Sequence, residues 1–116
     1  NKITRFPSRI FECAELRWLS LCHNQLREIP DSIGQLEKLE CLSLFNNDIG
    51  FISPEIGKLQ RLQILSLGNN KRLPVLLARD TVTFEETQLQ LRRVVEHFKN
   101  VKSCYCFLWC VPRITY

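Results

Sequence analysis

The residues of this chain best suited to chemistry are its six cysteines and two histidines. Three cysteines lie close together at Cys104, Cys106 and Cys110, and with His97 they could supply four ligands of the kind that bind zinc. Their spacing is not that of a usual structural zinc site, and no second cysteine pair follows. We therefore favour buried or unstructured thiols and expect no metal and no cofactor. Palmitoylation beside the basic residues of this tail stays an open alternative.

The other three cysteines precede residue 42. Cys13 stands where the later sequence has leucine, so we expect a small buried hydrophobic side chain there. Cys22 and Cys41 are predicted to be free thiols, which fits a reducing compartment and a cytoplasmic location. His23 follows Cys22, but no third group is evident that could orient the imidazole. No glycine-rich phosphate loop is present either, so we expect no enzyme and no small-molecule substrate.

The elements that must position these side chains recur every 23 residues. The stretch Leu16–Leu36 reads L-x-x-L-x-L-x-x-N-x-L-x-x-I-P-x-x-I-x-x-L. The positions that agree at this period are Leu16, Leu39 and Leu62; Leu19, Leu42 and Leu65; Leu21, Leu44 and Leu67; Asn24, Asn47 and Asn70; Ile33 and Ile56; and Leu36 and Leu59. A fixed period of this length in a Leu and Asn frame is the signature of leucine-rich repeats.

Within each repeat the pattern predicts a strand, a turn and a helical return. The strands are expected at about Leu19–Leu21, Leu42–Leu44 and Leu65–Leu67, with their leucines in the core and the intervening residues facing outward. The asparagine that follows each strand is expected to satisfy backbone groups of the neighbouring coil and to form a stacked ladder. A proline beside a small polar residue then predicts the start of a short helical turn.

The chain divides into three parts. Residues 1–77 are predicted to be leucine-rich repeats that lack the front half of the first repeat, which favours a piece of a longer array. Residues 78–103 are predicted to hold a helix at about 84–101, opened by a capping box at Thr83 and Glu86. Its apolar stripe, which is expected to seal the last repeat, is Leu91, Val94, Val95, Phe98 and Val101, with Lys99 and Lys102 at its basic end. Residues 104–116 form a cysteine-rich tail.

Residues 1–77 resemble the leucine-rich repeat superfamily, and the motif "IPxxIGxL" is most similar to the intracellular Ras-group and Erbin/Scribble type. The resemblance implies an α/β fold, a right-handed solenoid whose parallel strands line a concave sheet. It also implies a non-enzymatic scaffold or adaptor in signal transduction that binds a protein partner, with a small GTPase or a phosphatase as candidates. The "CYCFLW" segment resembles the start of the C-terminal cap of secreted leucine-rich repeat proteins, but here a helix intervenes and only Cys110 follows.

The predicted partner-binding residues are the outward positions of the strands and of the turns that follow them. They are Arg17, Trp18, Ser20, Cys22, His23, Glu40, Cys41, Ser43, Phe45, Asn46 and Ile64, with Asn69 at the rim. Trp18 and Phe45 are the large aromatic side chains in this set, and aromatic side chains with a polar surround are the usual anchors of protein interfaces. Phe51 is a second exposed candidate, although partial cover by an adjoining loop is favoured.

Net charge excludes one class of partner. The chain carries +4, and residues 1–70 hold eight basic and eight acidic side chains, so the whole excess lies after the repeats. This is too little for a nucleic-acid-binding protein, and no apolar run is long enough to span a membrane. Three alternatives stay open: these repeats only extend a longer array, they belong to a larger enzyme such as a kinase or ubiquitin ligase, or they come from a secreted receptor.

Overall fold

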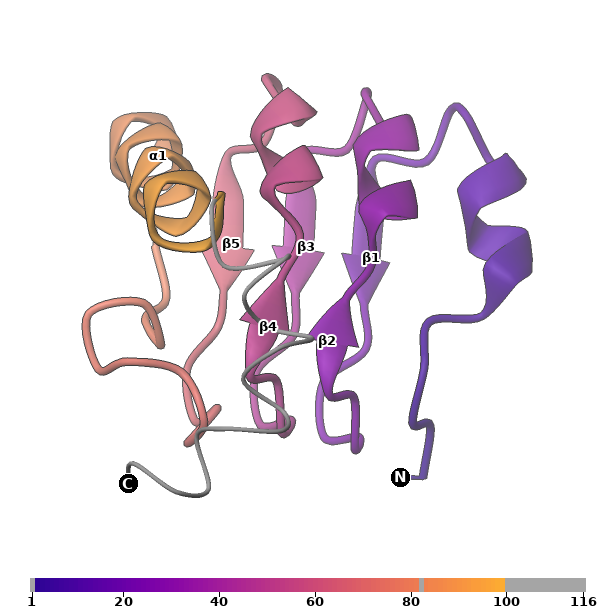
Figure 1. The fold of residues 1–116 in the computed structure, drawn as a ribbon. Coiled ribbons are helices and arrows are strands. Elements are labelled where there is room, and N and C mark those ends of the chain that lie inside the picture. The colour runs from indigo at the N-terminus through magenta and orange to yellow at the C-terminus, as the bar shows by residue number, and fades with distance from the viewer. Residues whose placement is uncertain (1, 82, 100–116) are drawn as a thin grey trace.

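A parallel three-stranded sheet forms one side of the molecule (Figure 1). The computed structural model describes residues 2–81 and 83–99. The strands are β1 (Trp18–Ser20), β3 (Cys41–Ser43) and β5 (Ile64–Ser66), in the order β1-β3-β5. Trp18 pairs with Cys41, and Cys41 pairs with Ile64, which is the 23-residue offset of the sequence frame. Each strand begins and ends one residue earlier than its predicted position.

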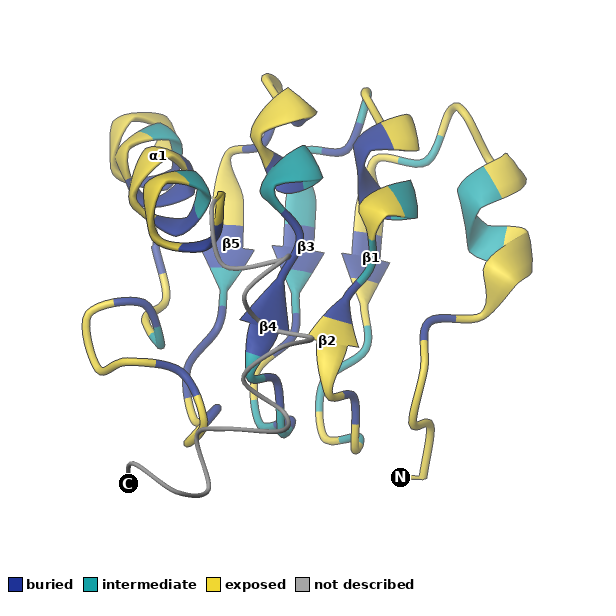
Figure 2. Cartoon of the chain, in the orientation of Figure 1, coloured by how far each residue is buried: buried dark blue, intermediate teal, exposed yellow. Residues whose placement is uncertain are grey.

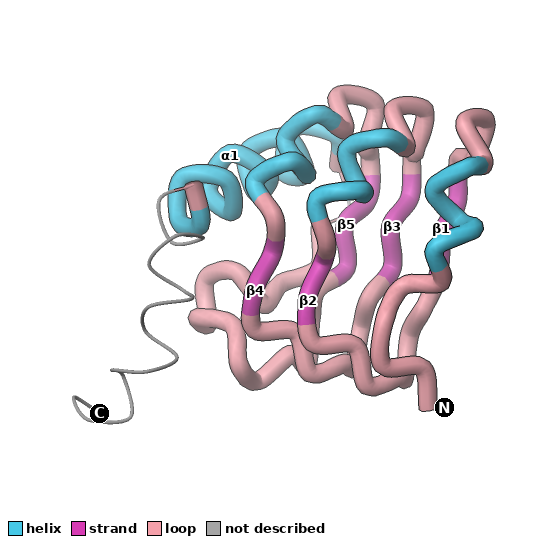
Figure 3. Tube along the Cα trace, turned by 45° about the vertical axis from the view of Figure 1, so that its right-hand side comes forward, coloured by secondary structure: helices cyan, strands magenta, loops and turns pink. Residues whose placement is uncertain are grey.

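The other side of each repeat is a short return path (Figure 3). It consists of the 3-10 helices η1 (Ser8–Glu12), η2 (Asp31–Gln35) and η3 (Pro54–Lys58), and of a second parallel sheet made by β2 (Glu28–Ile29) and β4 (Phe51–Ile52). Ser53 caps η3 by accepting a hydrogen bond from the Glu55 amide, as its place before Pro54 predicts. The second sheet was not predicted, because two-residue strands leave no period to detect.

The repeating leucines and isoleucines form the hydrophobic core between these two layers. Figure 2 shows buried positions on the strands and on the return path. Leu42, Leu44 and Leu65 are fully buried, which confirms that the strand leucines point inward. The first repeat is less well covered, since Leu21 is only half-buried although its counterparts at 44 and 67 are fully buried. A single repeat cannot bury its own apolar edge, so cover depends on neighbours.

The three frame asparagines form the ladder that the sequence predicts. Asn47 is the central one: its Oδ1 accepts from the Leu26 amide at 3.0 Å, and its Nδ2 donates to the carbonyls of Leu21 at 2.9 Å and Leu44 at 3.1 Å. Asn24 and Asn70 make the equivalent bonds in the adjoining coils. Each asparagine therefore ties its own coil to neighbouring backbone, where buried peptide groups need partners.

An antiparallel segment lies beside the last strand. Ser66 and Asp80 form an antiparallel bridge, the Leu67 amide donates to the Arg79 carbonyl at 3.0 Å, and the Thr81 amide donates to the Leu65 carbonyl at 3.0 Å. These bonds occupy the edge of β5 that faces away from β3. The reversal of chain direction that brings Asp80 beside Ser66 thus follows the end of the repeat frame, whose last matching position is Asn70.

Helix α1 (Phe84–Phe98) follows and packs on η3, β4 and β5 (Figure 1). Thr83 and Glu86 form the predicted capping box. Leu91, Val94 and Phe98 are buried, and the approach is close enough that a Cβ on Gly57 would lie 2.9 Å from Val95. The helix ends at residue 98 rather than 101. The predictions for Val101, Lys102, Cys104, Cys106 and Cys110 concern residues outside the described part of the chain.

Two predictions about single residues are wrong or need revision. Cys13 is exposed, not buried, because the first repeat has no coil on its outer side to cover that position. Phe51 is only 6% exposed, so it is not an exposed binding candidate. Its cover comes from α1 rather than from a loop, since the ring of Phe98 meets it edge-on at 5.2 Å.

Candidate binding face

The outward side chains of β1, β3 and β5, with those of the turns directly after them, form one surface that we call the strand face. Its first row is apolar and runs across all three strands through Trp18, Cys41 and Ile64. Trp18 is 72% exposed and Ile64 is 38% exposed, while Cys41 is half-buried between them. A strand alternates its side chains between two faces, so burial of Leu19 and Leu42 requires this exposure of their neighbours.

The second row contains the hydroxyl groups of Ser20 and Ser43, with the thiol of Cys22 beside them. The Cys22 Sγ lies 2.8 Å from the Ser43 Oγ and 3.4 Å from the Ser20 Oγ. Burial alone would raise the pKa of Cys22, but the two serine hydroxyls and backbone hydrogen bonds bring that pKa below its usual value. Burial raises the pKa of Cys41. The pKa values of the two thiols are therefore shifted in opposite directions, although both belong to this surface.

The third row is a ladder of side chains in the turns. Asn69 Nδ2 donates to Asn46 Oδ1 at 2.7 Å, and Asn46 Nδ2 lies 2.7 Å from His23 Nδ1. The φ angles of His23, Asn46 and Asn69 are 59°, 61° and 56°. Asn and His enter this positive region more readily than most residues do. The ring of Phe45, which is 36% exposed, meets His23 edge-on at 5.7 Å. This ladder gives the face a fixed polar border.

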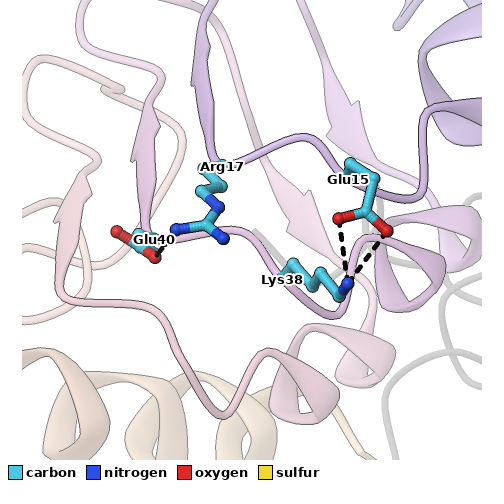
Figure 4. Close-up of polar contacts among 4 residues, drawn as sticks. All are labelled: Glu15, Arg17, Lys38 and Glu40. Atoms are coloured by element: carbon cyan, nitrogen blue, oxygen red, sulfur yellow. Dashed lines mark hydrogen bonds and ion pairs between the residues drawn. The ribbon is translucent and has the colours of Figure 1, made fainter.

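Charged pairs border the strand face on the side away from this ladder, and Figure 4 shows the four residues that form them. Arg17 and Glu40 are joined at 3.4 Å, and Lys38 and Glu15 are joined at 2.9 Å. Each pair links residues 23 positions apart, so each stacks one repeat on the next. Hydrogen bonding and charge from Lys38 lower the pKa of Glu15. Exposed pairs of this kind contribute little to stability, so their main effect is to give the border a charge pattern.

Asp80 closes the face at the β5 edge, and sequence reasoning missed it. Its carboxylate accepts from the Ser66 hydroxyl at 2.6 Å and from the Gly68 amide at 2.9 Å. A Cβ on Gly68 would lie 3.0 Å from that carboxylate and 3.1 Å from the Phe45 ring, so the glycine makes room for both. The sequence shows only that Asp80 lies beyond Asn70, the last position of the repeat frame, and this does not reveal which backbone groups the carboxylate meets.

All eleven predicted residues lie on the strand face or its border. Each is in β1, β3 or β5 or in the turn after β1 or β3, except Arg17 and Glu40, which directly precede β1 and β3. Phe51, the further candidate, is not among them. Within residues 2–81 and 83–99, no three Cys, His, Asp or Glu side chains gather in a way that could hold a metal ion. No helix in that part of the chain has the length and hydrophobicity of a membrane span.

Comparisons with known proteins agree with this architecture. A structure of a leucine-rich repeat protein of Leptospira interrogans is 37% identical, with a TM-score of 0.63; the match covers 79% of this chain and 22% of the other. The chain thus spans under a quarter of that protein. A search of curated proteins gave no match. A family model described as a leucine-rich repeat region matches residues 8–105. Most of the sequence lies within that match, and the chain belongs to the leucine-rich repeat family.

Proposed function

We propose that this chain is a protein-binding module that holds its partner on the strand face. Leucine-rich repeat domains generally mediate protein–protein interaction, and solenoid proteins use extended concave surfaces for it. The observation that carries the proposal is the exposure of Trp18, at 72%, in an apolar row with polar borders on both sides. Large aromatic side chains inside a polar rim are the usual centre of a protein interface.

The finer features of the proposal come from the sequence resemblance. The "IPxxIGxL" motif supports an intracellular scaffold or adaptor of the Ras-group type, located in the cytoplasm and without catalytic activity of its own. On that basis a small GTPase or a phosphatase is the partner class to test first. The packing of α1 against η3, β4 and β5 supports its role as the cap of the last repeat.

The test is affinity capture with the full chain and with matched variants. The double variant Trp18→Ala and Phe45→Ala removes both aromatic side chains of the strand face. Loss of an anchor that contributes at least about 2 kcal/mol would weaken binding roughly thirtyfold. Ile3→Ala is the control, because Ile3 is 37% exposed, close to the 36% of Phe45, and lies outside the face.

Two results would count against the proposal. A captured partner whose affinity is the same for the double variant and the wild type would place the interface elsewhere. An equal loss of affinity in the Ile3→Ala control would point to a general effect on the fold. Circular dichroism and thermal unfolding of each variant separate that second case from a true loss of contact.

A further inference from the structure

A second surface lies at the far end of the chain, away from the strand face. A pocket of about 630 Å³ opens between the turn at 74–77 and helix α1. Pro74, Leu76 and Leu77 line it on the turn side. Leu76 is 61% exposed and the adjacent Val75 is 82% exposed, so apolar surface continues beyond the pocket. Exposed apolar groups that gather beside a pocket are typical of interaction sites.

The apolar wall is held in place by a buried amide. Gln90 of α1 is 3% exposed, and its Nε2 donates to the carbonyls of Leu76 and Leu77, both at 3.1 Å. The turn also closes on itself, because the Leu77 amide donates to the Pro74 carbonyl at 2.8 Å. These two bonds from a buried side chain fix the distance between the turn and the helix. The pocket therefore belongs to the folded structure rather than to a mobile loop.

The helix wall is positively charged. Arg92, Arg93, Glu96 and His97 line it, and Glu96 is already joined to Lys99 at 3.1 Å. Among the described residues, the side chain of neither arginine has an ion-pair or hydrogen-bond partner. Two guanidinium groups beside a wall of proline and leucine favour a ligand that carries both carboxylates and apolar side chains, since arginine pairs with carboxylates through two parallel hydrogen bonds.

We propose that this pocket docks a segment of a partner protein in which apolar side chains alternate with Asp or Glu. Charge complementarity selects that occupant over the chain's own tail. Residues 100–116 are rich in apolar residues but contain no Asp or Glu, and their charged side chains, Lys102 and Arg113, have the same sign as the arginines. The distribution of charge agrees, because residues 71–116 hold eight basic and four acidic side chains. The inference does not depend on the function proposed for the strand face.

The experiment pans a random 12-residue peptide library against the full chain and measures the enriched peptides by fluorescence anisotropy. We expect sequences with several Asp or Glu beside Leu or Phe, whose affinity falls as salt rises. Leu76→Ser, and the double variant Arg92→Glu with Arg93→Glu, should each weaken binding at least tenfold. Arg92→Gln with Arg93→Gln is a milder pair, used if charge reversal disturbs the fold.

Two controls locate the effect. Arg5→Glu with Arg9→Glu changes the net charge by the same amount at exposed positions near the other end of the chain, and should leave affinity within twofold. Trp18→Ala with Phe45→Ala should also leave it unchanged, since those residues belong to the strand face. Equal losses in the two charge-reversal pairs, or a loss in the strand-face variant, would overturn the proposal. A library that yields no acidic peptides, as follows if residues 100–116 or a second copy fill the pocket, would overturn it too.

Discussion

Replacing Asn47 by alanine should destabilise the chain about twice as much as the same change at Asn24. Both residues occupy the same place in the repeat and use the same side-chain atoms. Asn47 is 9% exposed and lies between two coils, whereas Asn24 is half-buried at the start of the ladder. The pair therefore keeps the chemistry constant and changes only the surroundings.

The magnitude follows from what each substitution leaves without a partner. In Asn47→Ala the amide of Leu26, a fully buried residue, loses its acceptor, and an orphaned buried group costs about 1–3 kcal/mol. The carbonyls of Leu21 and Leu44 each lose one bond but keep another, from Asn24 and Asn70. At about 0.5–1.5 kcal/mol for each of these carbonyls, the three losses together come to about 4 kcal/mol.

In Asn24→Ala the same reasoning gives a smaller loss. The amide of Ile3 loses its acceptor, but Ile3 is exposed and water can replace the bond. The Leu21 carbonyl loses one of its two bonds and still accepts from Asn47, and the Cys22 carbonyl loses the bond that Asn24 Nδ2 donates at 3.0 Å. At about 0.5–1.5 kcal/mol for each carbonyl, we expect about 2 kcal/mol in all.

Urea denaturation followed by circular dichroism measures both values. With a slope of about 1.5 kcal/mol per molar urea, Asn47→Ala should lower the midpoint by roughly 2.7 M, and Asn24→Ala by roughly 1.3 M. Equal shifts for the two variants would refute the argument that burial of the backbone partner sets the cost. A slope that changes between variants would show altered unfolding rather than a lost contact.

Four further predictions follow from single contacts. Phe51→Ala should lower the free energy of unfolding by about 3–5 kcal/mol, because it empties the buried site against α1; thermal unfolding measures this. Thr83→Ala should cost about 1 kcal/mol by removing the capping box, and a cost near zero would contradict that role. Trp18→Ala should change stability by no more than about 0.5 kcal/mol, since the side chain is 72% exposed. Iodoacetamide should modify Cys22 at lower pH than Cys41, because the pKa of Cys22 is lowered and that of Cys41 is raised. The folded protein is labelled at a series of pH values and each site is quantified by mass spectrometry; modification of Cys41 at the lower pH would contradict the prediction.

The repeat frame could be read from the sequence because its signals are periodic. Leu42 and Leu65 are buried and pair in register because one spacing sets both the alternation and the stacking. Cys13 could not be judged in this way, since its burial depends on a neighbouring coil rather than on its own position in the frame. The burial of Phe51 could not be predicted for a similar reason, because Phe98, the residue that covers it, is 47 positions away in sequence.

The strand face was predictable to the same extent as the frame. Trp18 and Ile64 are exposed because the residues beside them are buried, which the pattern states directly. Asp80 and Gln90 were not predictable, because their roles depend on how a non-repeating segment folds back on the last repeat. Polar side chains that act across such a fold-back leave no period, and only the positions of their backbone partners reveal them.

The antiparallel bridge between Ser66 and Asp80 limits where a further repeat could be added to the array. A parallel strand added after β5 would have to displace the segment that already holds those backbone groups. A duplication that inserts a 23-residue unit between β3 and β5 would leave this closing segment intact, whereas one placed after residue 77 would separate it from its strand. Lengthening by gene duplication is therefore tolerated in the interior of this array and disfavoured at its C-terminal boundary.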